Sequence, residues 1–257
     1  MQNILGIIPA RWASSRFPGK PLALINNKPM VWWVYRASKQ VLEHVVVATD
    51  DARIMEAVKA FGGEAVLTSS DHPNGSTRCL EAHKIYSEQM GLSFTDGIIN
   101  IQGDEPMLEP ELLQRLVEIL KEDEVNVGTL VSRVEDARDL ENESEAFVCL
   151  DHAHNALYFS RSVIPFVRGV SRAEWLDHHV FYKHLGLYAW RPNALAAFCG
   201  LPISSLEKAE SLEQNRWLEA GFKVRCAVAK SRSIPVDTPA DLQLVRQKME
   251  GHSPEWL

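Results

Sequence analysis

Apolar runs alternate with amphipathic stretches through the first 126 residues. The continuous apolar runs predict buried strands at 3–8, 44–51, 64–68 and 97–101. Apolar residues at helical spacing, with Pro or polar residues at the start, predict helices at 28–40, 51–61, 77–90 and 110–122. Strand, loop and helix in this regular repetition indicate an α/β fold, with a mostly parallel sheet covered by helices on both faces.

The second half of the chain is less regular. Its pattern predicts strands at 127–134, 181–190 and 223–230, a hairpin of 146–151 with 156–166, and helices at 205–221 and 239–249. The acidic segment 135–146 is expected to be exposed, and "IPVDTPADL" reads as a polar turn. Because no repeat or long linker separates the halves, we expect 127–250 to pack on 1–126, followed by a loose tail at 251–257.

Composition excludes several classes of binding partner and a membrane-spanning segment. The 257 residues carry a net charge of -7, which argues against a nucleic-acid or anionic-membrane surface, because both need a broad basic field. No stretch approaches the roughly 18 apolar residues of a membrane span. The N-terminal run contains Gly6 and Pro9 and has no basic segment before it, so it reads as a first strand and not as a signal peptide. We expect a cytoplasmic protein.

The four cysteines are far apart and form no CxxC pair. They are Cys79, Cys149, Cys199 and Cys226. This spacing is typical of neither a zinc site nor a disulfide framework, so we expect buried free thiols in a reducing compartment.

Polar loops follow the predicted strands at 9–20, 49–51, 71–78 and 102–106. Ligands of parallel sheets bind outside the carboxyl ends of strands, so these loops predict one site. The first loop carries Arg11, Arg16 and Lys20, which suit a ligand with several negative charges, such as a nucleoside triphosphate balanced by these cations and a divalent ion. A solvated basic loop is the alternative.

The first loop matches neither of two familiar phosphate motifs. A P-loop needs Gly at position 14 and Ser or Thr at position 21, where this chain has Ser14 and Pro21, and a GxGxxG is absent. Phosphate binding would therefore rely on the three cations, helped by backbone N–H groups around Ser14 and Ser15.

The loop "IIPARWASSRFPGKPL" resembles the signature of sugar nucleotidyltransferases, most closely that of the 3-deoxy-manno-octulosonate (Kdo) cytidylyltransferases, or CMP-Kdo synthetases. The resemblance runs through nearly the whole chain, in "VVVATDD", "DHPNGSTR", "NIQGDEPM", "ALYFSRSVIPF", "KHLGLYAW", "SLEKAESLEQNRWLEAG" and "PVDTPADL". It implies a Rossmann-like nucleotidyltransferase sheet with a smaller sugar-binding and dimerisation part, and a homodimer. It also implies transfer of CMP from CTP to an acidic eight-carbon sugar for lipopolysaccharide biosynthesis.

The resemblance implies roles for the loop residues. The nucleotide would contact Arg11, Arg16, Lys20, Ser76, Arg78 and Gln102, and Mg²⁺ would be held by Asp104 and Asp237. The catalytic set would be Lys20, Arg11, Arg16, Asp104 and Asp237. From the residues alone, Asp104 reads as the cap of the following turn and Asp237 as an Asx-turn before a helix, so their metal roles rest on the resemblance. No side chain stands out as a general base.

The sugar would contact the second half, through Ser160, Arg161, His184, Tyr188, Glu210, Glu213 and Gln214. An arginine suits the carboxylate of a keto acid sugar. His184 and Tyr188 alternate with apolar positions and can share one side of a strand. The last three residues have the i, i+3, i+4 spacing of one helix face. A core histidine and a solvated glutamate face remain the alternatives.

The chain departs from the family pattern at three positions. Thr77 stands where the family usually has glutamate, and Ser144 and Phe147 stand where it commonly has asparagine and lysine. These changes alter local charge, which suggests the 8-amino-8-deoxy analogue of Kdo as the sugar. Other acidic sugars, a guanylyl- or uridylyltransferase, and a non-catalytic nucleotide sensor on the same fold remain alternatives.

Overall fold

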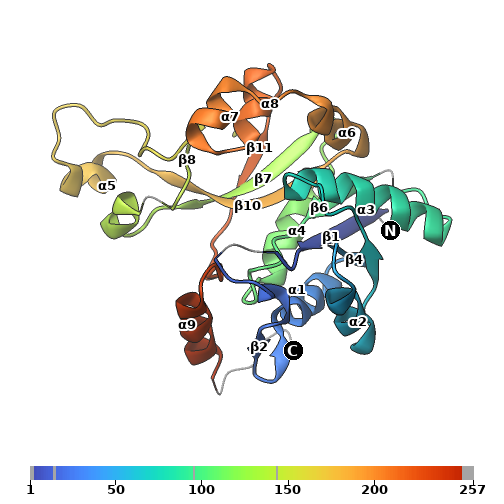
Figure 1. Cartoon of the computed structure of the whole chain (residues 1–257). Helices are drawn as coiled ribbons and strands as arrows, with labels where there is room; N and C mark the ends of the chain where they lie inside the picture. Colours follow the sequence, from blue (N-terminus) through green and yellow to red (C-terminus); the bar gives the residue numbers. More distant parts are fainter. Residues whose placement is uncertain (1–2, 14–15, 95, 143, 251–257) are drawn as a thin grey trace.

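The computed structural model describes residues 3–13, 16–94, 96–142 and 144–250. A nine-stranded mixed sheet forms the centre of this part of the chain (Figure 1). Its main path runs β11-β7-β10-β6-β1-β4-β5, and β8 and β9 extend from β10. The strands are β1 (Ile4–Ala10), β4 (His44–Thr49), β5 (Ala65–Leu67), β6 (Gly97–Asn100), β7 (Val127–Arg133), β8 (Phe147–Leu150), β9 (Ala156–Ser160), β10 (Tyr182–Trp190) and β11 (Arg225–Val228).

The predicted parallel sheet is confirmed. β1 pairs in parallel with β4 and β6, β4 with β5, and β7 with β11. The antiparallel strands are β10, which lies between β6 and β7, and the hairpin of β8 and β9 that extends from it. Because β7, β10 and β11 lie in the same sheet as the first strands, the sheet is continuous across residue 126.

Helices cover both faces of the sheet (Figure 1). One apolar cluster packs α3, α6 and α8 on Leu5, Ile7 and Val46. The other packs α1, α2 and α4 on Ile4 and Ile8, the alternate positions of the same strand. The helices are α1 (Met30–Lys39), α2 (Ala52–Ala60), α3 (Gly75–Met90), α4 (Pro110–Ile119), α5 (Trp175–His178), α6 (Pro192–Gly200), α7 (Ser205–Glu210), α8 (Gln214–Glu219) and α9 (Pro239–Met249).

Two smaller clusters complete the fold. The β8–β9 hairpin and α5 form an arm to one side of the sheet, with its own core around Phe147, Trp175 and Phe181 (Figure 1). The other cluster packs α9 beside a small sheet of β2 (Leu24–Ile25) and β3 (Lys28–Pro29). Short 3-10 turns occur at Lys20–Leu22, Ala137–Glu141 and Arg172–Glu174.

The single helix predicted at 205–221 is wrong. α7 ends at Glu210, Ser211 adopts a left-handed conformation with φ of 53°, and α8 begins at Gln214. A left-handed residue turns the chain out of the helix, so Leu212 enters the core on a new axis. Glu210 and Glu213 therefore do not share a helix face.

The other predicted helices and strands are confirmed with small changes of their bounds. The hairpin forms, but β9 ends at Ser160 and no strand continues to 166. The segment 135–146 is mostly exposed, although Leu140 enters the core of the arm. α6 was not predicted. The tail at 251–257 lies outside the described residues.

All four cysteines are free thiols; Cys79 and Cys226 are buried and the other two are partly exposed. In the described part of the chain, no helix is both long enough and apolar enough to span a bilayer.

Candidate active site

A cavity of about 290 Å³ opens at the carboxyl ends of β1 and β6 and beside the first turn of α3. It brings together all the predicted nucleotide and metal residues except Ser76, which lies buried beside it. The lining residues are Pro9, Ala10, Arg11, Arg16, Lys20, Pro21, His72, Pro73, Asn74, Gly75, Arg78, Gln102, Gly103, Asp104 and Asp237.

A backbone hydrogen bond closes the loop that carries Arg11, Arg16 and Lys20. The N–H of Gly19 donates to the carbonyl of Trp12 across 3.0 Å, and Gly19 has the positive φ that this tight return requires. The Trp12 ring lies against Gly19 on one side, and the Arg53 guanidinium stacks on this ring at 3.3 Å from the centroid. These contacts hold Lys20 at the cavity. Ser14 and Ser15 lie outside the described residues.

Lys20 lies between the two predicted metal carboxylates. Its Nζ is 2.8 Å from Oδ2 of Asp104 and 3.3 Å from Oδ1 of Asp237. The N–H of Val236 donates to the carbonyl of Asp104, which fixes the two segments side by side. Arg16 also reaches Asp237, at 3.0 Å. The site therefore contains two carboxylates and two cations in direct contact.

Neither aspartate caps a helix. Thr238 is the N-cap of α9 and forms a capping box with Asp241. The N-cap position of α4 is Glu109. The carboxylates of Asp104 and Asp237 therefore serve no helix cap, and each contacts a cation at the cavity instead.

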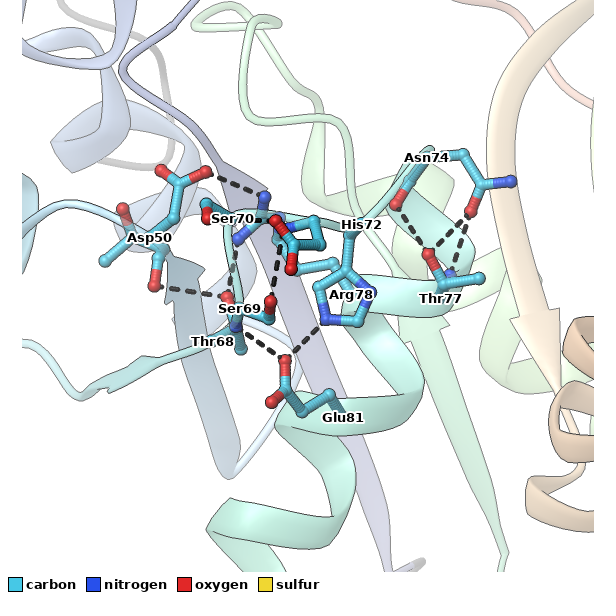
Figure 2. A network of polar contacts seen from close by, with 11 residues as sticks. Asp50, Thr68, Ser69, Ser70, His72, Asn74, Thr77, Arg78 and Glu81 are labelled. Carbon is cyan, nitrogen blue, oxygen red and sulfur yellow. Dashed lines mark hydrogen bonds and ion pairs between the residues drawn. The ribbon is translucent and has the colours of Figure 1, made fainter.

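The loop that precedes α3 is held by the network in Figure 2. Arg78 is only 3% exposed, and its guanidinium donates to Oδ2 of Asp50 at 2.9 Å and to Oγ1 of Thr68 at 2.6 Å. Glu81 accepts from the backbone N–H of Ser69 and contacts His72. Two of the donors of Arg78 are thus engaged within the protein, and the rest of this side chain lines the cavity.

Thr77, the first departure from the family pattern, belongs to the start of α3. Asn74 is the N-cap, and its side chain accepts from the N–H of Thr77 (Figure 2). The Thr77 hydroxyl lies within hydrogen-bond distance of the carbonyl and side-chain oxygens of Asn74. Because a glutamate at this third helical position would complete a capping box, the change to threonine is a change of helix cap.

Two contacts link the cavity to the predicted sugar residues. Ser76 donates from Oγ to Oε1 of Glu213 at 2.7 Å, and burial raises the pKa of the Glu213 carboxyl. Gln102 donates from Nε2 to the carbonyl of Gly186 in β10 at 2.7 Å. Gly186 has a φ of 65° and lies where the register of β10 against β7 shifts, between His184 and Tyr188.

The rings of His184 and Tyr188 lie together, with centroids 5.2 Å apart. Nε2 of His184 is 2.8 Å from Oγ1 of Thr129. Burial, helped by the positive charge of Arg161, lowers the pKa of His184 to about 3. The imidazole is therefore neutral near pH 7 and can exchange hydrogen bonds with a hydroxyl group.

Glu210 belongs to a separate group beside the end of β9. Its carboxylate accepts from the Ser160 hydroxyl at 2.8 Å, from the N–H of Arg161 at 2.9 Å and from the Tyr158 hydroxyl at 3.1 Å. The Arg161 guanidinium is exposed and donates to the carbonyl of Ser144. Phe147, the departure where the resemblance implies lysine, is 1% exposed in the core of the arm and pairs with Ser160 across the hairpin.

Sequence reasoning missed several residues of the site. His72 and Asn74 line the cavity, and Asp50 and Glu81 hold its wall. The position of the loop 71–78 after a strand was the available signal. No group of three or more His, Cys, Asp or Glu side chains that could hold a metal occurs in the described residues.

Comparison with known proteins gives one family. The family model described as "Cytidylyltransferase" matches residues 5–229. The 3-deoxy-manno-octulosonate cytidylyltransferase of Parabacteroides distasonis is 47% identical over 247 residues, covering 95% of this chain and 96% of the relative. The protein of the same name from Bacteroides thetaiotaomicron is 45% identical over 254 residues, covering 98% of this chain and 100% of the relative.

Solved structures agree. A CMP:2-keto-3-deoxy-manno-octonic acid synthetase in complex with CTP is 38% identical, with a TM-score of 0.86, covering 96% of this chain and 98% of that chain. A glucose-1-phosphate thymidylyltransferase from Bacillus anthracis is 15% identical, with a TM-score of 0.66 over 98% of this chain and 97% of that chain, and it shares the fold alone. The chain belongs to the cytidylyltransferase family, among its 3-deoxy-manno-octulosonate cytidylyltransferases.

Proposed function

We propose that this enzyme transfers CMP from CTP to the anomeric hydroxyl of Kdo and releases pyrophosphate. The observation that carries the proposal is the single cavity that joins Arg11, Arg16 and Lys20 to Asp104 and Asp237. In the reaction, the anomeric oxygen forms a bond to the α-phosphorus while the bond from this phosphorus to the β-phosphate oxygen breaks. The hydroxyl proton goes to solvent, and the leaving charge goes with pyrophosphate.

The cations of the first loop suit the triphosphate. Lys20 and Arg16 are held by carboxylates at the mouth of the cavity, so their charges are already in place when the nucleotide arrives. Stabilising the charge of the departing pyrophosphate is the main task in such transfers, where little covalent work falls to the protein. We assign this task to Lys20, Arg11 and Arg16.

The donor set at Asp104 and Asp237 fits Mg²⁺. This ion commonly takes one or two protein carboxylates and completes its shell with water and substrate phosphates. Both carboxylates lie within 3.3 Å of the same Lys20 Nζ, so one small cation could reach both. When bound, Mg²⁺ would neutralise phosphate charge and lower the pKa of the attacking hydroxyl.

The sugar would lie against β9, β10 and the α7–α8 turn. Arg161 has an exposed guanidinium that suits the sugar carboxylate, while Glu213, Gln214, His184, Tyr188 and Glu210 would bind hydroxyl groups. A homodimer formed through the second half, a cytoplasmic location and a role in lipopolysaccharide biosynthesis remain predictions.

The 8-amino analogue of Kdo is the second candidate sugar. One observation favours it: at Phe147, beside Ser160 of the sugar region, an apolar side chain replaces the lysine of the family pattern. A lost cation would ease the approach of a charged amine. Thr77 adds nothing to this argument, because its hydroxyl lies against Asn74 in the cap of α3.

The test is pyrophosphate release with CTP and Mg²⁺, comparing Kdo, its 8-amino analogue and another acidic sugar, with GTP and UTP in place of CTP as controls. We expect release with CTP and an eight-carbon keto acid sugar. Release mainly with the amino sugar would select the second candidate. CTP binding without release from any sugar would overturn the transferase proposal and leave a nucleotide-binding protein.

A further inference from the structure

Asn100, the last residue of β6, carries a buried amide oxygen without a hydrogen-bond partner in the described part of the chain. The residue is 3% exposed, and its Oδ1 is fully buried with no hydrogen-bond partner in the described part of the chain. An unpaired buried polar group lowers the stability of the folded protein, and native proteins contain few of them. A ligand that donates a hydrogen bond to Oδ1 of Asn100 would remove this loss of stability.

Asn100 lies between the nucleotide cavity and the sugar residues. It pairs in register with Ile7 of β1 on one side and with Tyr188 of β10 on the other. A Cβ atom added to Gly75 would stand 3.7 Å from Nδ2 of Asn100, so the missing side chain of Gly75 leaves this side of the amide uncovered. Gly75 itself lines the cavity.

Ser76, the residue after Gly75 in α3, links this position to Glu213. Ser76 donates to Glu213, and the charge of Glu213 acts on Tyr188, the register partner of Asn100. Gly75 and Ser76, neighbours in the first turn of α3, thus connect Asn100 with Glu213.

The unpaired atoms at this border match a sugar better than a phosphate. Besides Asn100 Oδ1, the buried Oε2 of Glu213 and Nε2 of Gln214 have no hydrogen-bond partner among the described residues. Ionised phosphate groups offer acceptors alone, so they cannot serve Oδ1 or Oε2. A hydroxyl group both donates and accepts, and it can pair with the Asn100 amide whichever way this amide is turned.

We infer that Asn100 binds the acceptor sugar, through hydrogen bonds between its amide and a hydroxyl group next to the reacting centre. This inference rests on the proposed function. The amide oxygen would then be paired only when the sugar is bound, which lowers the stability of the free protein.

The test compares Asn100→Leu with Asn155→Leu. Leucine has nearly the shape of asparagine but no polar atom. Asn155 is also buried, but its amide is fully engaged: it donates to Asp151 at 3.0 Å and accepts from Arg225 at 3.2 Å, far along the sheet from the cavity. Thermal unfolding, the Kd for CTP and the KM for the sugar are measured for both variants.

We expect Asn100→Leu to keep or raise the melting temperature, to raise the KM for the sugar at least tenfold and to leave the Kd for CTP within twofold. Asn155→Leu should lower the melting temperature and leave the KM unchanged. Asn100→Ala adds no volume and should raise the KM for the sugar in the same way. The same result in both variants would show that the effect does not come from poor packing of leucine.

The two proposals fail separately. Turnover of the sugar by the wild-type protein, with an unchanged KM in both Asn100 variants, would overturn the role of Asn100 alone. A wild-type protein that binds CTP but turns over no sugar would overturn the proposed function.

Discussion

The nucleotide cavity differs in construction from the proposed sugar region. By this region we mean Ser160, Arg161, His184, Tyr188, Glu210, Glu213 and Gln214. In the cavity, side chains from loops of the same sheet edge meet as opposite charges, and Lys20 contacts Asp104 and Asp237 directly. In the sugar region, Glu210 bonds to Ser160 and Glu213 bonds to Ser76, each within its own small group. The first region is therefore held together by ion pairs in the free protein, whereas the second contains buried polar atoms without a partner among the described residues, which we propose bind the sugar.

The largest expected effect tests the charged region. Asp104→Asn removes one carboxylate beside Lys20 and from the proposed Mg²⁺ site, so kcat should fall about 10³-fold, the scale seen when one preorganised electrostatic group is lost. Steady-state pyrophosphate release measures this. Asp136→Asn is the matched control and should leave kcat unchanged, because among the described residues the Asp136 carboxylate pairs only with the exposed Arg138. More than a tenth of wild-type activity in Asp104→Asn would contradict the assignment.

The next effect concerns the wall of the cavity. Asp50→Ala leaves the buried Arg78 guanidinium without its carboxylate, which should cost about 3 kcal/mol in the free energy of unfolding. Urea unfolding measures this cost, and the double variant Asp50→Ala, Arg78→Met should recover part of it. A loss no larger than that of a surface variant would show that the pair in Figure 2 does not hold the wall.

A smaller effect tests the sugar region through pH. Burial lowers the pKa of His184 in the folded protein to about 3, below its ordinary value near 6.5. Between these two pH values, His184 is therefore protonated in the unfolded chain and neutral in the folded protein. The folded state gains from neutral His184 above pH 6.5 and loses this stability as the pH falls toward 3.

At pH 5 the loss should reach up to about 2 kcal/mol relative to pH 7. His184→Gln keeps a side chain that can bond to Thr129 but does not titrate, so its unfolding free energy should lack this component. Equal pH dependence in both proteins, measured by urea unfolding, would contradict a buried neutral imidazole.

The smallest effect tests the break between α7 and α8. Ser211→Gly should raise the free energy of unfolding by about 0.5 kcal/mol, because glycine adopts the left-handed conformation without strain. Ala209→Gly, at an exposed position inside α7, should lower it by about the same amount. Destabilisation by both variants in thermal unfolding would favour one continuous helix over 205–221.

The parallel core and the cavity could be predicted because their signals are local. Continuous β-branched runs mark buried strands, and the loops at their carboxyl ends must meet at one sheet edge. This reasoning placed Arg11, Lys20 and Asp104 together, as the cavity confirms.

The rest depends on contacts distant in sequence. The antiparallel position of β10 between β6 and β7 is set by its neighbours and not by its own pattern. α6 is rich in Ala and apolar nearly all round, so it lacks the polar face that marks a helix. The break at Ser211 arises because Leu212 packs into the core, which no spacing rule reveals.

The division of labour between the two regions is tested most directly by the Kd for CTP, measured by calorimetry with Mg²⁺ in Lys20→Met and Glu213→Gln. We predict that Lys20→Met weakens CTP binding at least tenfold, while Glu213→Gln leaves the Kd within twofold and raises only the KM for the sugar. CTP binding weakened equally by both variants would contradict the account, because Glu213 would then belong to the nucleotide site.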